Sequence, residues 1–416
     1  MTILGVPEQA LVEERALTLF ASPEIASARQ DLLALFRADR NAKLLDQEAL
    51  IVRSVEEHLF HGCLVAANET PHDPRFVWSI TPAHDWMGKS IPGSRFGQDN
   101  TDNIYRVSTI DPACSYRIKG RFAGPLPIDF SICALPAQIG EHMAADVVGF
   151  INMALIDIAD DGSFTIDADP TATDGRRNHL DIGRAKSLMV RDTMADWSVE
   201  RPSSLTIERT DAPAEDRYDP KAAAARAADL IKIIAGFFLD KIQHGMFEVD
   251  ALNHVPVPVP SGARGGLITQ CATGGYFRLG DEEALVITTD RLGAGYLGVQ
   301  NVDMWMISYE YRNRTSSLNH TQAVADADGK FRFIVCASDP GAWNWLDSSG
   351  NACGSLLFRW QNLPTGVELA GCISSEVVRL DALRDRLPPE TRYVDAAGRE
   401  AQRDERYRGY MCRLTA

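Results

Sequence analysis

The chain has 416 residues, of which 45% are hydrophobic and 24% charged, and its formal net charge is -15 at pH 7. This length predicts two domains or one large domain with helical additions, and it excludes a small scaffold held together by disulfides. The acidic excess argues against a nucleic-acid or anionic-membrane surface, because phosphates would be repelled. No apolar run reaches the roughly 18 residues of a membrane-spanning helix, and no amino-terminal signal is visible. We therefore expect a cytoplasmic protein without nucleic-acid or membrane partners.

Several common chemical motifs are missing from the sequence. Eight cysteines are scattered without a CxxC pair, which is typical of small buried side chains in reduced form. Gly293–Gly298 matches G-x-G-x-x-G in letters only, because it lies between strand-like runs and does not open a helix. There is no G-x-S-x-G and no H-E-x-x-H. We therefore predict no cofactor.

Residues 1–70 are predicted to form a helical region. Ser22-Pro23-Glu24 combines an N-cap, a proline at the first helical position and an acid in the first turn, and apolar residues follow at helical spacing. His58 and His61 stand three residues apart and could bind a metal. The neighbouring glutamates indicate instead that both histidines lie on a solvated helix face.

Strands are predicted from Phe76 onward, where the hydrophobic period changes from 3.6 to 2. In Ile128–Ala134, for example, apolar side chains alternate with Asp129, Ser131 and Cys133, which indicates an antiparallel sheet with one solvated face. Residues 71–215 form a first β-unit by this criterion. A linking helix is expected in 216–250, beginning at Asp219-Pro220 and running to about His244.

A second β-unit is expected in 251–390, and a charged, helical tail in 391–416. The run Ala159–Ile166 resembles Ala327–Phe333, because each is a turn that leads into a strand. We therefore predict a mainly β, α+β protein. Its two antiparallel β-sandwich units are joined by a helix and preceded by a helical region. One large sheet with helices on one face is the alternative.

The segment Arg95–Arg106 is the densest polar run in the sequence. Its carboxylates, Asp99 and Asp102, are candidate catalytic acids or bases. Its candidate substrate-binding residues are Arg95, Asn100, Asn103 and Tyr105. Such groups can bind the oxygens of a sugar-like ligand. A calcium ion near Asp99 and Asp102 is a rival interpretation, although the spacing is not that of an EF-hand. A network of Asx-turns that only closes the loop is another.

A second candidate segment runs from Asn301 to His320. In an unbroken strand Asp303, Trp305, Tyr309 and Tyr311 would share one face, and such a face could cover a ligand pocket or pack between sheets. Asp303 and His320 are candidate catalytic residues. Trp305, Tyr309, Tyr311 and Asn319 are candidate substrate-binding residues.

A third candidate segment is the Pro-Gly loop 339–347. Trp343 and Asn344 are candidate substrate-binding residues, since an exposed tryptophan pair would need a ligand, a subunit or a neighbouring sheet to cover it. Asp347 is a candidate catalytic carboxylate, and Arg359 on the next strand a candidate ligand contact. A structural ion pair between Asp347 and Arg359 is the alternative.

These segments resemble the bacterial proteins grouped as domain-of-unknown-function family 1214. The resemblance rests on Asp99–Tyr105, on Asn301–Gln322 with its Arg312–Asn319 run, and on Asp326–Phe331, Asp339–Asp347 and Arg359-Trp360. It covers about 95–365. It implies a jelly-roll-like β-sandwich and assembly as an oligomer. Members occur among bacterial catabolic genes, which implies an enzyme, but no reaction and no catalytic residue can be transferred.

The leading functional prediction is an acid/base enzyme, a hydrolase or lyase, acting on a ring-containing oxygenated small molecule such as a glycoside or sterol-like compound. Asp99 or Asp102 would be one carboxylate and Asp303 or Asp347 the other. Tyr105, Asn319 and His320 would orient the substrate. The alternatives are a non-catalytic carbohydrate- or lipid-binding sandwich and a structural homo-oligomer.

Overall fold

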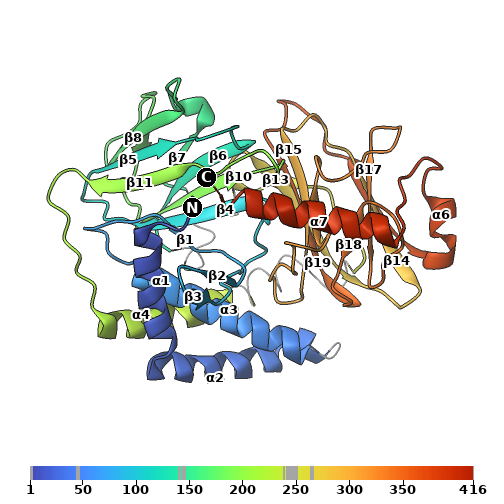
Figure 1. The fold of residues 1–416 in the computed structure, drawn as a ribbon, viewed down its shortest axis with the longest axis horizontal. Coiled ribbons are helices and arrows are strands. Elements are labelled where there is room, and N and C mark those ends of the chain that lie inside the picture. The colour runs from blue at the N-terminus through green and yellow to red at the C-terminus, as the bar shows by residue number, and fades with distance from the viewer. Residues whose placement is uncertain are drawn as a thin grey trace.

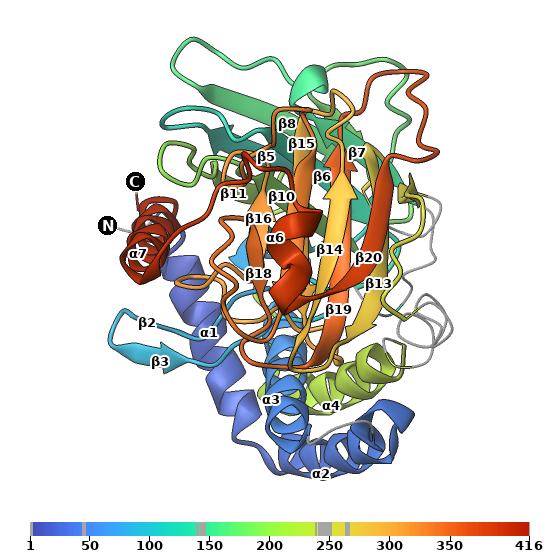
Figure 2. The same cartoon turned by 90° about the vertical axis from the view of Figure 1, so that its right-hand side faces the viewer.

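The computed structural model describes residues 3–43, 47–138, 141, 147–237, 239, 252–262 and 267–415. Two β-sandwiches lie next to each other above a layer of helices, and a further helix lies along the second sandwich and ends beside the first (Figure 1). Figure 2 shows strands of the second sandwich standing above that helical layer. The predicted class, a mainly β fold with a helical amino-terminal region, is confirmed.

The helical layer consists of α1 (Pro7–Phe20), α2 (Pro23–Ala38), α3 (Glu48–Ala67) and α4 (Pro220–Phe237). Ser22 caps α2 as predicted, because its hydroxyl accepts a hydrogen bond from the Ile25 backbone N–H at 3.4 Å. Asp219 does the same for α4, accepting from Lys221 at 2.9 Å. Residue 238 and residues 240–251, where the linking helix was expected to end, lie outside the described residues.

The prediction of a solvated face at His58 and His61 is wrong. Both are 2% exposed, because α3 is covered by α1, α2 and α4 and also faces the sheets. The ring Nδ1 of His61 lies 3.3 Å from the Ser79 carbonyl. Burial lowers the pKa of His61 to about 3. Both residues are therefore part of the packed interior and not metal ligands on a surface.

The first sandwich has a five-stranded and a four-stranded sheet. In spatial order the five strands are β1 (Val77–Trp78), β4 (Asn103–Thr109), β10 (Ser187–Thr193), β6 (Asp129–Leu135) and β7 (Gly149–Asn152). The four strands are β11 (Ser204–Arg209), β5 (Tyr116–Arg121), β8 (Ser163–Asp169) and β9 (His179–Asp181). A separate ribbon of β2 (His84–Trp86) and β3 (Lys89–Ile91) follows β1.

The second sandwich repeats this arrangement. Its five strands are β12 (Val259–Pro260), β13 (Gln270–Arg278), β19 (Cys353–Gln361), β15 (Tyr296–Val302) and β16 (Ser317–Asn319). Its four strands are β20 (Ile373–Arg379), β14 (Glu283–Thr289), β17 (Phe331–Cys336) and β18 (Trp345–Asp347). Each strand has its counterpart in the same place and chain order, and β8–β9 and β17–β18 are both parallel pairs. The two similar turn sequences lead into β8 and β17, which are counterparts.

Each sandwich has its own core between its two sheets. The first contains Phe130, Ile132, Leu188 and Val190, and the second contains Leu297, Val299, Phe358 and Trp360. The opposite faces of the five-stranded sheets were expected to be solvated. They are buried instead, because the helical layer and the other sandwich cover them: Ser131 and Gln300 are both 0% exposed.

The carboxyl-terminal helix α7 (Ala396–Cys412) connects the two sandwiches (Figure 1). Near its start, the Arg399 guanidinium pairs with Asp339 of the second sandwich at 2.8 Å. Just after its end, Arg413 donates to the Thr101 carbonyl of the first sandwich at 2.6 Å. Two short helical turns, η6 (Leu380–Ala382) and α6 (Leu383–Arg386), precede it, and η2 (Met153–Leu155) follows β7. In the described part of the chain no helix is long and apolar enough to cross a membrane.

Candidate functional site

Asp102 lies at the centre of the contact between the two sandwiches. Its Oδ1 accepts hydrogen bonds from Trp197 Nε1 at 2.8 Å and Asn319 Nδ2 at 2.9 Å, and its Oδ2 accepts from the Tyr296 hydroxyl at 2.6 Å. Burial raises its pKa, while these donors and the nearby arginines of the α7 region oppose the rise. Tyr296 and Asn319 belong to the second sandwich, so this carboxylate of the first sandwich joins the two.

Other residues of the first segment are also engaged within the fold. Asp99 accepts from the Ser308 hydroxyl at 2.9 Å, and Arg95 donates to Glu57 of α3 through two nitrogens. Asn100 is an acceptor for Gln300 Nε2 at 2.9 Å, and its backbone N–H donates to the Tyr105 hydroxyl at 3.0 Å. Asp99 and Asp102 thus bind different partners and do not share the ligand set expected for calcium.

The second segment does not form the expected unbroken strand. β15 ends at Val302, and the Asp303 carboxylate then closes a tight turn by accepting from Trp305 N at 2.8 Å and Ile307 N at 3.0 Å. Its other oxygen pairs with Arg53 of α3 at 2.7 Å.

The turn at Asp303 sends the three aromatic residues to different places. Trp305 packs near Phe36 in the helical layer, and the Tyr309 hydroxyl donates to the Cys353 carbonyl at 3.2 Å. Tyr311 packs against Trp197 and Tyr410. The prediction that they share a face is wrong, because it required an unbroken strand.

The third segment is folded onto its own sandwich. Asp347 pairs with Arg314 at 2.9 Å and not with Arg359, and Trp343 Nε1 donates to the Gln322 carbonyl at 2.9 Å. The Asn344 amide bonds to both backbone groups of Val324. These contacts hold the loop, in which Trp345 is buried and Trp343 is partly exposed.

His320 follows β16 at the edge of the sandwich contact. Its Nδ1 accepts from the Leu297 backbone N–H at 3.3 Å, and burial lowers its pKa to about 4. The structure therefore brings Asp102, Asn100 and Asn319 together, and it places Asp303 and Asp347 in separate networks of their own.

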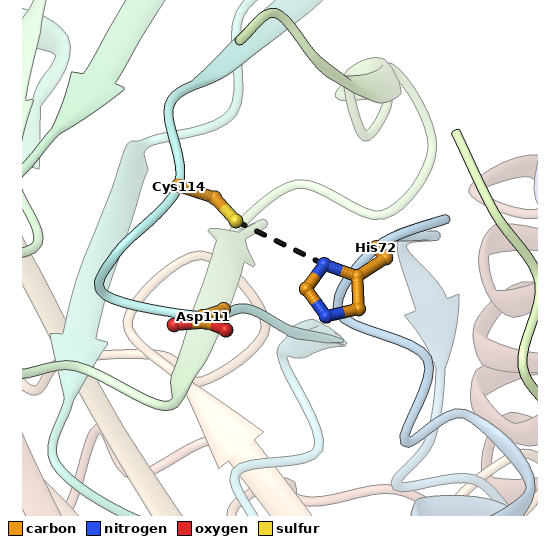
Figure 3. A group of neighbouring side chains, drawn as sticks. All are labelled: His72, Asp111 and Cys114. Carbon is orange, nitrogen blue, oxygen red and sulfur yellow. Dashed lines mark hydrogen bonds between the residues drawn. The ribbon is translucent and has the colours of Figure 1, made fainter. Parts of the chain in front are cut away.

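One group of side chains has the atoms of a metal site (Figure 3). Ligand atoms of His72, Asp111 and Cys114 lie within 4.8 Å of one another. The Tyr116 hydroxyl donates to the Pro71 carbonyl at 2.9 Å and accepts from Asp111 N at 2.8 Å, which fixes both segments.

The surroundings of that group oppose a cation. The Arg209 guanidinium lies 3.0 Å from His72 Nδ1, so a positive charge already occupies one side of the group. Burial also raises the pKa of the Cys114 thiol, which disfavours the thiolate that binds metals. We therefore assign no metal to it.

Several buried polar atoms have no hydrogen-bond partner among the described residues, on the buried face of the first five-stranded sheet. Thr193 lies directly opposite Asp129, and Arg191 directly opposite Ser131, so the four side chains are neighbours on one face. Asp129 Oδ2, Ser131 Oγ and Thr193 Oγ1 are buried without a hydrogen-bond partner among the described residues. Burial raises the pKa of Asp129, and Asn362 of the second sandwich and the Arg191 charge oppose that rise.

Arg191 is a half-buried guanidinium with few contacts. It donates to Cys133 Sγ at 3.3 Å and lies 6.0 Å from the centre of the Tyr105 ring. No carboxylate pairs with it in the described part of the chain. We call Arg191, Asp129, Ser131 and Thr193 the Arg191 face.

At the corresponding position of the second sandwich, the arginine has oxygen acceptors for its hydrogen bonds. Arg359 stands two residues before the end of β19, as Arg191 stands two before the end of β10, and it donates to the Gln300 side chain and the Gln98 carbonyl. Gln300 is the counterpart of Cys133. Gln300 lies opposite the residue two before Arg359, and Cys133 lies opposite the residue two before Arg191. Arg191 therefore meets a cysteine sulfur where its counterpart meets a carboxamide oxygen.

The alternation of Asp129, Ser131 and Cys133 was visible in the sequence and was interpreted as a solvated face. What the sequence could not show is that Arg191 lies opposite Ser131, because this pairing joins strands that are 60 residues apart. Asn103 and Tyr105, both predicted to bind substrate, line the neighbouring strand opposite Thr193 and Arg191.

No protein-family profile and no curated protein matches the chain. Among solved structures, it is similar to an uncharacterized protein from Burkholderia cenocepacia, with a TM-score of 0.72 and 25% identity, covering 88% of this chain and 99% of that chain. The VPA0106 protein from Vibrio parahaemolyticus aligns with a TM-score of 0.42 and 10% identity, covering 68% and 90% of the two chains. The Burkholderia protein shares the fold, and its description states no ligand or reaction.

Proposed function

We propose that the chain binds a small hydroxylated ring compound that carries a carboxylate, and that it does so at the Arg191 face. One observation carries this proposal: a half-buried guanidinium without a carboxylate partner stands beside three buried oxygens that lack hydrogen-bond partners among the described residues. Arginine binds carboxylates through two parallel hydrogen bonds. Sugar acids supply both that carboxylate and the hydroxyls that Asp129, Ser131 and Thr193 can bind.

Asp129 is the group for acid/base chemistry at this face. Its raised pKa brings its protonation equilibrium closer to neutral pH, where a general acid or base is most effective. Of the four residues of the Arg191 face, one carries a carboxyl group, whereas glycoside hydrolysis usually uses two. A lyase that moves a proton on an anchored carboxylate therefore fits the geometry better than a glycosidase.

The test uses glucuronate as the probe and glucose as its uncharged match. We expect the wild-type protein to bind glucuronate in calorimetry, and Arg191→Gln to weaken binding about 10- to 100-fold. Arg117→Gln, at an exposed ion pair, is the matched control. Equal affinity for glucuronate and glucose, or no effect of Arg191→Gln, would refute the site.

Substitution of Asp129 distinguishes catalysis from simple binding. If the protein is a lyase, it should catalyse exchange of the glucuronate C5 proton in D2O, followed by NMR. Asp129→Asn should then lower the exchange rate about 100-fold or more while binding persists. Binding without exchange in the wild type would support the non-catalytic alternative.

Kinship with domain-of-unknown-function family 1214 is proposed on the sequence motifs given above. It predicts a homo-oligomer, which light scattering on the purified protein tests. A monomer at micromolar concentration would contradict that part of the proposal.

A further inference from the structure

A cavity of about 300 Å³ opens at one edge of the first sandwich, away from the Arg191 face. It lies between the edge strands β1 and β11 and is bounded by residues near the amino terminus. Leu4, Phe76, Trp78 and Leu205 line it with apolar surface. This volume is at the lower end of the range for small-molecule sites.

Two hydrogen-bond donors stand next to each other in this cavity. Trp78 of β1 lies directly opposite Arg106 of β4, and both residues line the cavity. Trp78 Nε1 and Arg106 Nε are buried without partners in the part of the chain that the structure describes, although the two residues are only 2% and 4% exposed. A buried donor without an acceptor is destabilising, so a ligand oxygen at this point would satisfy both.

The charged residues that line the cavity are all basic, although Arg106 is paired with Asp192 and Lys119 with Glu208 at 2.7 Å. Besides Arg106, its lining includes Lys119 and Arg121 at the exposed side of β5, and no lining residue is acidic. Arg106 also binds Asp192 and Ser203 through its terminal nitrogens, which hold the guanidinium in place behind the cavity. A guanidinium N–H beside an indole N–H favours a carboxylate over a neutral carbonyl, because hydrogen bonds between charged groups are the stronger ones.

At the corresponding edge of the second sandwich, the chain binds the counterpart of Arg106. Thr273 is the counterpart of Arg106. It lies opposite the residue three before the end of β19, and Arg106 lies opposite the residue three before the end of β10. Its hydroxyl donates to the Pro256 carbonyl at 2.6 Å, and Val255 is 2% exposed within that core. The chain thus supplies an acceptor at the second edge, whereas the first edge has an opening and two donors without partners among the described residues.

We propose that this cavity, defined by Trp78, Arg106 and Leu205, binds a small apolar ring compound with a carboxylate. The ring would lie on the apolar wall, and the carboxylate oxygens would accept from Trp78 Nε1 and Arg106 Nε. This site is separate from the Arg191 face and does not depend on it.

The experiment is calorimetric titration of the full chain with 2-naphthoate and with the neutral 2-naphthamide. We expect saturable 2-naphthoate binding that is at least about tenfold tighter than that of the amide. Trp78→Phe keeps the ring and removes one donor, so it should weaken 2-naphthoate about tenfold and leave 2-naphthamide unchanged. Leu205→Trp should abolish binding of both by filling the cavity.

Arg191→Gln is the matched control, because it should leave 2-naphthoate binding intact and impair only glucuronate. The proposal fails if wild type does not bind 2-naphthoate, or if Trp78→Phe, with an unchanged circular dichroism spectrum, binds both probes like wild type. Loss of glucuronate binding alone would reject the function proposed at the Arg191 face and leave this site standing.

Discussion

The two sandwiches share one topology but use corresponding positions differently. Arg359 in the second sandwich donates to Gln300 and Gln98, while its counterpart Arg191 donates only to the Cys133 sulfur among the described residues. Thr273 in the second edge is bound by the chain, while Arg106 at the same position of the first edge retains an unpartnered donor. At these two positions the second sandwich satisfies its polar groups within the chain, whereas the first leaves buried polar atoms without partners among the described residues, and our proposals rest on this difference.

The largest expected effect tests the contact between the sandwiches. Asp102→Ala removes an acceptor of Tyr296, Trp197 and Asn319. Trp197 Nε1 then loses its acceptor, while Tyr296 keeps only Asn100 at 3.2 Å and Asn319 keeps the Ala195 carbonyl at 2.9 Å. We expect a loss of about 3–5 kcal/mol in the free energy of unfolding, measured by urea denaturation. Asp161→Ala, in an exposed turn, should stay within about 0.5 kcal/mol. Similar values for both variants would show that the sandwiches do not depend on this carboxylate.

A second variant exchanges corresponding residues. Gly298 is the counterpart of Ser131, and a Cβ at Gly298 would lie 1.9 Å from the Tyr296 hydroxyl. Gly298→Ser should therefore displace that hydroxyl from Asp102 and destabilise the protein by about 2–3 kcal/mol. The reverse exchange, Ser131→Gly, should be milder, at about 1 kcal/mol. Thermal denaturation of both variants checks the order.

The two arginines give the sharpest form of the comparison. Arg359→Gln should destabilise the protein by about 2 kcal/mol, because two buried acceptors lose their donor. Arg191→Gln should change stability by less than about 0.5 kcal/mol and act on ligand binding instead. Equal destabilisation by the two substitutions would remove the distinction between support and site.

The smallest effect concerns pH. His320 has Met153 as its counterpart, and its folded-state pKa of about 4 lies below the ordinary value of 6.5. Stability from the neutral ring is present above pH 6.5 and is lost as the pH falls toward 4, because only the unfolded chain then binds the proton. His320→Met should reduce the fall in Tm between pH 7 and pH 4.5 by about 2 °C. An unchanged slope would assign the acid sensitivity to other groups.

Local features were predictable from sequence and distant pairings were not. The cap at Ser22, the start of α4 at Asp219 and the two similar turns before β8 and β17 depend on a few adjacent residues. The partners of Asp102 do not depend on adjacent residues, because Tyr296 lies 194 residues away in the chain. Polar residues at Asp99, Asp102 and Asp303 therefore suggested catalysis, although the fold uses them to join its parts.

Helix α7 also sets an order of events during synthesis. It follows both sandwiches in the chain, and Arg399 and Arg413 attach it to one sandwich near each of its ends. Domains usually fold as they leave the ribosome, amino-terminal ones first. Each sandwich would thus form its own core before the helix arrives, and the contacts of α7 would be added to the direct contact at Asp102 only when translation has delivered residues 396–413.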